Sequence, residues 1–165
     1  MKLKTLAAAS AVALTALSSH AADTAWGQHD LLESALGLTA GGIIFDTFSF
    51  SLGVQSDVAS SVSALGSIGA GTYSLFSVGG DGLVGTSDDV GFGAWTFAGA
   101  PTVHNVSLAA GNYYYSVFGT AQGVAAYSIN SAASAAPVPE PETYALLGAG
   151  LGVIGFLVSR RRRDR

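Results

Sequence analysis

The chain has 165 residues, of which 49% are hydrophobic, and this length suits a single domain. It contains no cysteine, which excludes a disulfide framework, a thiolate zinc site and a cysteine nucleophile. All 7 basic residues lie at the two ends, so residues 22–136 contain no lysine or arginine. The same residues hold eight acidic side chains, and their charge of −8 excludes a free-standing nucleic-acid-binding protein.

Residues 1–21 have the pattern of a secretory signal peptide. Two lysines precede an uncharged, apolar run at residues 6–17, and the small residues Ser19 and Ala21 stand at positions −3 and −1 of a cleavage site. We therefore expect signal peptidase to cleave near Ala21 and the rest of the chain to be exported. An N-terminal helix of the folded domain is the alternative.

The polar segment 22–42 follows, and we expect it to lead into the folded domain. It contains one predicted short helix at about residues 30–36. Asp30 is a suitable N-cap for this helix and Gly37 a suitable stop.

Residues 43–131 have the pattern of short β-strands. The strand IFDTFSFSL, 44–52, alternates in polarity and places Asp46 on the same face as Phe48 and Phe50. Glycine-containing turns separate it from six further predicted strands at 58–65, 72–78, 90–97, 103–108, 113–119 and 124–129. This spacing predicts an all-β fold, an antiparallel β-sandwich of the jelly-roll or Ig-like kind, with a closed barrel as the alternative.

Aromatic side chains supply the bulky part of the predicted core, with a sugar-stacking platform as the alternative. The set is Phe48, Phe50, Phe76, Trp95, Phe97, Tyr113, Tyr115 and Phe118. The three consecutive tyrosines at 113–115 must alternate across their strand. We therefore expect Tyr114 to be exposed, which makes it a candidate ligand contact.

Asp46 is the acidic residue on the apolar face of its strand. An ionised carboxylate in that position needs partners that offset its loss of hydration. The domain has no lysine or arginine to pair with it. Backbone N–H groups at the strand start, a hydroxyl, a histidine and a metal ion remain as its possible partners.

Three carboxylates and two hydroxyls lie within the glycine-broken segment DGLVGTSDD, residues 81–89. Such oxygen donors suit Ca²⁺, so Asp81, Asp88 and Asp89 are candidate calcium ligands. The segment departs from the EF-hand pattern, because its third and fifth residues are leucine and glycine. A solvated turn without metal is the alternative, and no cofactor is required.

A Pro/Ala-rich linker at residues 132–143 contains a Pro-Glu-Pro sequence and precedes an apolar segment. Residues 144–158 are uncharged and predict a single transmembrane helix, although 15 residues would cover only ~22 Å of a ~30 Å hydrocarbon core. The arginine-rich tail, 159–165, would stay in the cytoplasm, so the acidic domain would face outward. We expect a transient hold in the inner membrane, with a plain tail anchor as the alternative.

The Pro-Glu-Pro sequence, the Gly/Leu-rich apolar helix and the terminal arginine cluster together resemble the PEP-CTERM sorting signal. In that family the signal is the substrate of exosortase, a membrane-embedded cysteine-type transpeptidase. The prolines would keep the residues before them extended and open to such an enzyme. The sorting residues would be Pro139, Glu140, Pro141, Arg160, Arg161, Arg162 and Arg163.

The middle of the chain resembles the FxDxF family of PEP-CTERM proteins. The resemblance rests on the IFDTFSFSL strand, the closing segment 108–129 and the PEPETYALLGAG junction. Asp46 and Phe48 occupy motif positions, whereas Ile44 replaces the first phenylalanine. The resemblance implies export and a surface or extracellular-matrix role.

These features predict an exported, exosortase-processed protein of the cell surface or exopolysaccharide matrix, with a structural or adhesive role in biofilm or floc. Its partners would be signal peptidase, exosortase and exopolysaccharide, and no nucleic acid. A calcium-dependent carbohydrate-binding module is the first alternative, and a secreted hydrolase is the second. We expect no enzyme, because His29 and His104 are isolated in the sequence and no catalytic motif is present.

Overall fold

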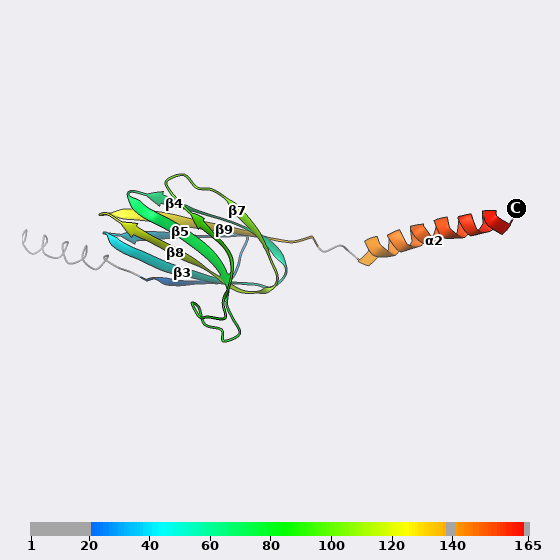
Figure 1. The fold of residues 1–165 in the computed structure, drawn as a ribbon, viewed down its shortest axis with the longest axis horizontal. Coiled ribbons are helices and arrows are strands. Elements are labelled where there is room, and N and C mark those ends of the chain that lie inside the picture. The colour runs from blue at the N-terminus through cyan, green and yellow to red at the C-terminus, as the bar shows by residue number, and fades with distance from the viewer. Residues whose placement is uncertain (1–20, 138–140, 164–165) are drawn as a thin grey trace, which may run out of the picture.

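The structure, a computed structural model, describes residues 21–137 and 141–163, and its body is a sandwich of two β-sheets (Figure 1). The predicted signal peptide, apart from Ala21, lies outside the described residues. Pro139 and Glu140 of the predicted sorting signal lie outside them as well.

Nine strands in the described residues form the two sheets. The five-stranded sheet has the order β1-β3-β8-β5-β6, and the four-stranded sheet has the order β2-β9-β4-β7. β1 runs parallel to β3, and the other pairings are antiparallel. The strands are β1 Asp23–Gln28, β2 Leu32–Thr39, β3 Gly42–Leu52, β4 Ser56–Leu65, β5 Ile68–Ser77, β6 Val90–Thr96, β7 His104–Leu108, β8 Gly111–Ala121 and β9 Ala125–Ala135.

The two-sheet sandwich confirms the predicted all-β architecture, and each of the seven predicted strands corresponds to one of β3 to β9. The predicted helix at residues 30–36 is wrong, because β2 occupies Leu32–Thr39. Both β1 and β2 arise from the segment that was expected to lead into the domain, and one joins each sheet.

β2 departs from the usual pattern of a half-buried strand. It turns Leu36 and Leu38 to solvent, whereas Ala35, Gly37 and Thr39 face the interior. Gly37 pairs directly with Tyr127 on β9, and a Cβ at Gly37 would overlap the Tyr127 ring. The interior therefore needs a glycine where a sequence pattern expects a large apolar residue, and this inversion concealed the strand.

The core lies between the sheets and contains most of the expected aromatic residues. Phe48, Phe50 and Tyr115 are buried, and each packs against Trp26 of β1. Phe50 also stacks on Tyr115. The prediction is wrong for Phe118, which is 41% exposed because it has the same parity as the outward positions of β8. It is also wrong for Phe76, which is half-buried and stacks on Tyr114 outside the core.

The C-terminal helix α2 spans Pro141–Arg163. The structure does not support the predicted transmembrane helix. Among the described residues, no helix combines the length and apolar character that crossing a membrane requires.

Candidate functional site

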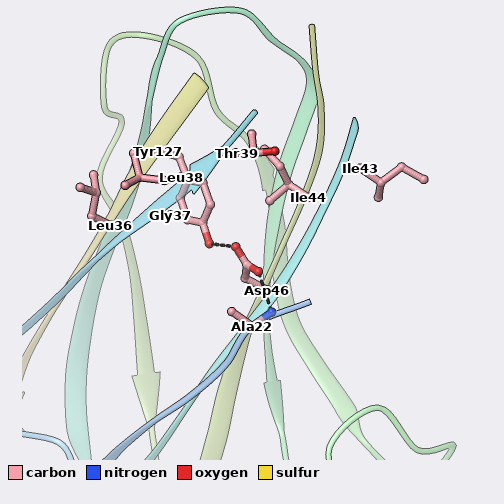
Figure 2. Close-up of a pocket in the computed structure, with 9 residues that line it drawn as sticks. All are labelled: Ala22, Leu36, Gly37, Leu38, Thr39, Ile43, Ile44, Asp46 and Tyr127. Atoms are coloured by element: carbon pink, nitrogen blue, oxygen red, sulfur yellow. Dashed lines mark hydrogen bonds between the residues drawn. The ribbon is translucent and has the colours of Figure 1, made fainter. Parts of the chain in front are cut away.

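A buried carboxylate, that of Asp46, joins the two sheets. Asp46 lies on β3 and is only 6% exposed. Its Oδ2 accepts a hydrogen bond from the Tyr127 hydroxyl of β9, and its Oδ1 accepts one from the backbone nitrogen of Ala22 at 2.8 Å (Figure 2). Two of the partners that the sequence left open, a hydroxyl and a backbone N–H, are therefore present.

A cavity of about 180 Å³ adjoins this carboxylate. The leucines of β2 and the isoleucines of β3 form its apolar wall, and Asp46, Tyr127 and Ala22 line its polar end (Figure 2). Burial, together with the hydrogen bond and charge of Asp46, raises the pKa of Tyr127 far above its usual value. The Tyr127 hydroxyl therefore keeps its proton and remains a donor to the carboxylate.

Ala22 is fixed on both sides of its peptide unit. Its carbonyl accepts a hydrogen bond from the backbone N–H of Thr47 at 2.9 Å, while its nitrogen donates to Asp46. The parallel pairing of β1 with β3 begins at the next residue, where Asp23 lies opposite Thr47 and accepts a hydrogen bond from its hydroxyl. The edge strand is thus registered on β3 from its first residue.

The acidic loop, residues 79–89, projects from the sandwich as the green loop of Figure 1. One oxygen of Asp89 accepts a hydrogen bond from the Gly79 N–H at 2.8 Å. The other accepts hydrogen bonds from the N–H groups of Gly85 and Thr86 and from the Tyr114 hydroxyl. Asp89 therefore closes the loop and fastens it to β8.

The remaining two carboxylates also serve the loop. The Thr86 hydroxyl donates to Asp88 at 2.6 Å, and Asp81 accepts from the Leu83 N–H at 2.9 Å. Within the described part of the chain, no group of three or more histidine, aspartate or glutamate side chains is placed to hold a metal ion. Calcium binding by Asp81, Asp88 and Asp89 stays a prediction.

The structure corrects the expected exposure of Tyr114. This residue does point away from the core, but it is only 4% exposed because the acidic loop covers it. Its ring stacks on Phe76, with centroids 5.2 Å apart, and its hydroxyl donates to Asp89. Burial and the neighbouring Asp89 raise the pKa of Tyr114 to about 12, so the side chain is an anchor for the loop rather than an open ligand contact.

A polar chain, which the sequence does not indicate, links the half-buried His29 to the buried Ser131 and Tyr115. The His29 Nε2 lies 2.8 Å from the Ser131 hydroxyl, which lies 2.9 Å from the Tyr115 hydroxyl. Ser131 is 0% exposed, whereas His29 is half-buried, so the chain runs from the surface into the core. His29 and Ser131 are 102 residues apart, and no local pattern could have revealed their contact.

Comparison with known proteins identifies the C-terminal segment. Residues 137–163 match the PEP-CTERM protein-sorting motif. The chain carries a PEP-CTERM sorting motif. This finding confirms the resemblance seen at Pro139, Glu140, Pro141 and the arginine cluster, and it covers that segment alone.

The β-sandwich is similar to a solved structure. It resembles the pre-peptidase C-terminal domain of collagenase from Bacillus anthracis, with a TM-score of 0.50 and 16% sequence identity, over 69% of this chain and 98% of that domain. This likeness concerns the fold. Among curated proteins, none matches the chain in sequence.

Proposed function

We propose that this protein is an exosortase substrate that is exported and retained at the cell surface or in the exopolysaccharide matrix, where it has a structural or adhesive role. The observation that carries the proposal is the PEP-CTERM sorting motif at residues 137–163, which follows directly on a complete β-sandwich. A sorting signal joined to one folded domain makes that domain the cargo.

Features of the sandwich support a binding or structural role over catalysis. In the described Ser–His pair the serine is buried and its hydroxyl is shared with Tyr115, and the carboxylates of the acidic loop are engaged by the loop itself. Large apolar side chains are exposed on both sheets, with Leu36 and Leu38 on β2 and Ile43 and Phe45 on β3. Such side chains suit contact with other material at a surface.

The resemblance to the FxDxF family belongs to the same proposal. Asp46 and Phe48, which carry that resemblance, are both buried, so their part in the proposed role is to stabilise the sandwich and not to contact a ligand.

Processing can be tested in a host that contains exosortase and in the same host without it. We expect the mature protein from the first host to have lost the residues beyond the Pro-Glu-Pro sequence, and the protein from the second to retain them, as measured by intact mass. Replacing Pro139, Glu140 and Pro141 together by alanine should reproduce the second result in the first host. Asp57→Asn, which removes an exposed carboxylate far along the chain from the motif, is the matched control.

Retention can be measured by fractionating the same cells. We expect the processed protein in the surface and matrix fraction, and a chain without residues 139–165 in the medium. An identical mature mass and location with and without exosortase would contradict the proposal.

A further inference from the structure

The backbone nitrogen of Ala22 lies 2.8 Å from the buried carboxylate of Asp46. In the uncleaved chain this nitrogen is a neutral peptide N–H. Cleavage between Ala21 and Ala22, which the small residues at positions −3 and −1 predict, would turn it into an α-ammonium group. We propose that Asp46 is a binding site for the protein's own mature N-terminus, and that signal-peptide cleavage completes the sandwich by forming an Ala22–Asp46 ion pair.

The charge of the domain makes this partner important. Asp46 is 6% exposed, and residues 22–136 contain no lysine or arginine. A buried carboxylate with neutral donors alone keeps much of its desolvation cost, whereas a hydrogen bond from a charged donor is roughly twice as strong as a neutral one. The α-ammonium group would be the one fixed positive charge among residues 22–136.

The position of Ala22 is set independently of that charge. The Thr47 N–H holds the Ala22 carbonyl, and the pairing of β1 with β3 begins at Asp23. A chain that starts at residue 22 therefore presents its ammonium group to Asp46 without losing a strand contact. A start one residue earlier would move the charge by ~3.3 Å along the strand.

The surroundings can accept the cleaved form. The cavity of about 180 Å³ reaches Ala22, Asp46 and Tyr127, which leaves room for the additional protons of an ammonium group and for water. The Tyr127 hydroxyl already occupies the second carboxylate oxygen. The carboxylate of Asp23, which accepts from the Thr47 hydroxyl, adds a second negative charge beside the terminus.

Blocking the terminal amine tests the pair directly. The chain without its signal peptide, residues 22–165, contains no lysine, so an acetylating reagent can modify its α-amine alone among the amines. The chain is made by cleaving a fusion that leaves Ala22 first. We expect acetylation to lower its melting temperature by about 5 °C. In Asp46→Asn the same acetylation should change the melting temperature little. In the control Asp57→Asn, acetylation should lower the melting temperature as much as in the chain without a substitution.

A second comparison leaves Asp46 intact, in case Asp46→Asn fails to fold. A chain that begins at Ala21 retains a free amine but displaces it by one residue. We expect this chain to melt below the chain that begins at Ala22. Equal melting temperatures of the two chains, or an acetylation effect that is the same with and without Asp46, would overturn the proposal.

The inference rests on the predicted cleavage after Ala21 and not on the surface role. The mass of the exported protein shows its first residue, and a mature terminus other than Ala22 would also overturn the inference. That result would leave processing at the C-terminus unaffected, so the failure of one proposal is distinguishable from the failure of the other.

Discussion

Gly37 makes room for the side chain that satisfies Asp46. It pairs with Tyr127 across the β2–β9 ladder, and the Tyr127 ring lies over it. An aromatic ring that covers a glycine on the neighbouring strand recovers apolar contact that the glycine lacks. The ring must stay in this place for its hydroxyl to reach Asp46 in the other sheet.

Gly37→Ala should therefore destabilise the sandwich. The added Cβ would overlap the Tyr127 ring and displace its hydroxyl from Asp46, and we expect a loss of about 2 kcal/mol in the free energy of unfolding. Urea unfolding of the chain of residues 22–165 measures this loss in the free energy of unfolding. Gly53→Ala is the matched control, because a Cβ at Gly53 meets only the Gln28 side chain, at 3.5 Å. Equal losses in the two variants would contradict this explanation.

Tyr127→Phe tests the hydrogen bond without changing the packing. It leaves the buried Asp46 carboxylate without one of its two donors, and we expect unfolding free energy to fall by about 2 kcal/mol. Tyr113→Phe is the control, since the Tyr113 hydroxyl donates to a backbone carbonyl at 3.0 Å and not to a carboxylate. In Tyr113→Phe we expect the free energy of unfolding to fall by about half as much. A smaller fall in Tyr127→Phe than in Tyr113→Phe would contradict the importance of the carboxylate contact.

The sequence limits the partners of Asp46 but cannot choose among them. Alternation on its strand correctly places Asp46 on the buried face, and the absence of lysine and arginine from the domain excludes a side-chain cation other than histidine. The actual donors, Ala22 and Tyr127, lie 24 and 81 residues away in the chain. Only the pairing of β1 with β3 and the packing of the two sheets bring them to the carboxylate.

At the scale of elements, strands whose large apolar side chains face the core were predictable, and β1 and β2 were not. β3 alternates over its length because one face meets the core and the other faces outward. β2 carries its leucines outward, and β1 contributes mainly Trp26 to the core. β2 does alternate, but with its leucines on the exposed face, and β1 is short, so each depends on a partner strand for its place.

The acidic loop is an element held by carboxylate charge, and its order should depend on pH. Burial opposes the charge of Asp89, but hydrogen bonds from Gly79, Tyr114, Gly85 and Thr86 outweigh it and lower the pKa of Asp89 below its usual 3.8. Because the folded pKa lies below the unfolded one, the stabilisation is present above pH 3.8 and is lost as the pH falls through the lower folded value.

We therefore expect the amide protons of Gly85 and Thr86 to be protected from exchange at pH 5 and to lose this protection as the pH approaches 2. Asp89→Asn should abolish the pH dependence by leaving the loop open at both pH values. Asp57→Asn should retain it, since Asp57 is an exposed residue of β4 outside the loop. Unchanged protection in Asp89→Asn would show that the loop is held by something else.

At the scale of the whole molecule, a feature could be predicted when its residues are close together in the chain, and it was missed when they are far apart. The sorting motif is contiguous, so residues 137–163 could be recognised without a structure. The sandwich follows from the spacing of seven strands. The covering of Tyr114 by the acidic loop depends on contacts 25 residues apart, which explains why its exposure was predicted wrongly.

The uneven charge of the molecule leads to a last prediction. Residues 22–136 hold eight acidic side chains and no lysine or arginine, so compaction brings like charges together without side-chain ion pairs to offset the repulsion. Raising NaCl from about 10 to about 300 mM shortens the screening length several-fold and should raise the melting temperature of the chain of residues 22–165 by a few degrees. A flat or falling melting temperature would contradict this role of repulsion.

Measuring the melting temperature in calcium as well distinguishes general screening of charge from binding of Ca²⁺ at one site. CaCl₂ at the ionic strength of the NaCl series should raise the melting temperature further if the acidic loop binds Ca²⁺, and Asp88→Asn should remove that increment. Asp88 is the suitable position, because Asp89 is already bound to four donors and its loss would open the loop even without metal. An increment that survives in Asp88→Asn would instead assign the effect of calcium to the charge of the whole sandwich, whose eight carboxylates attract any cation.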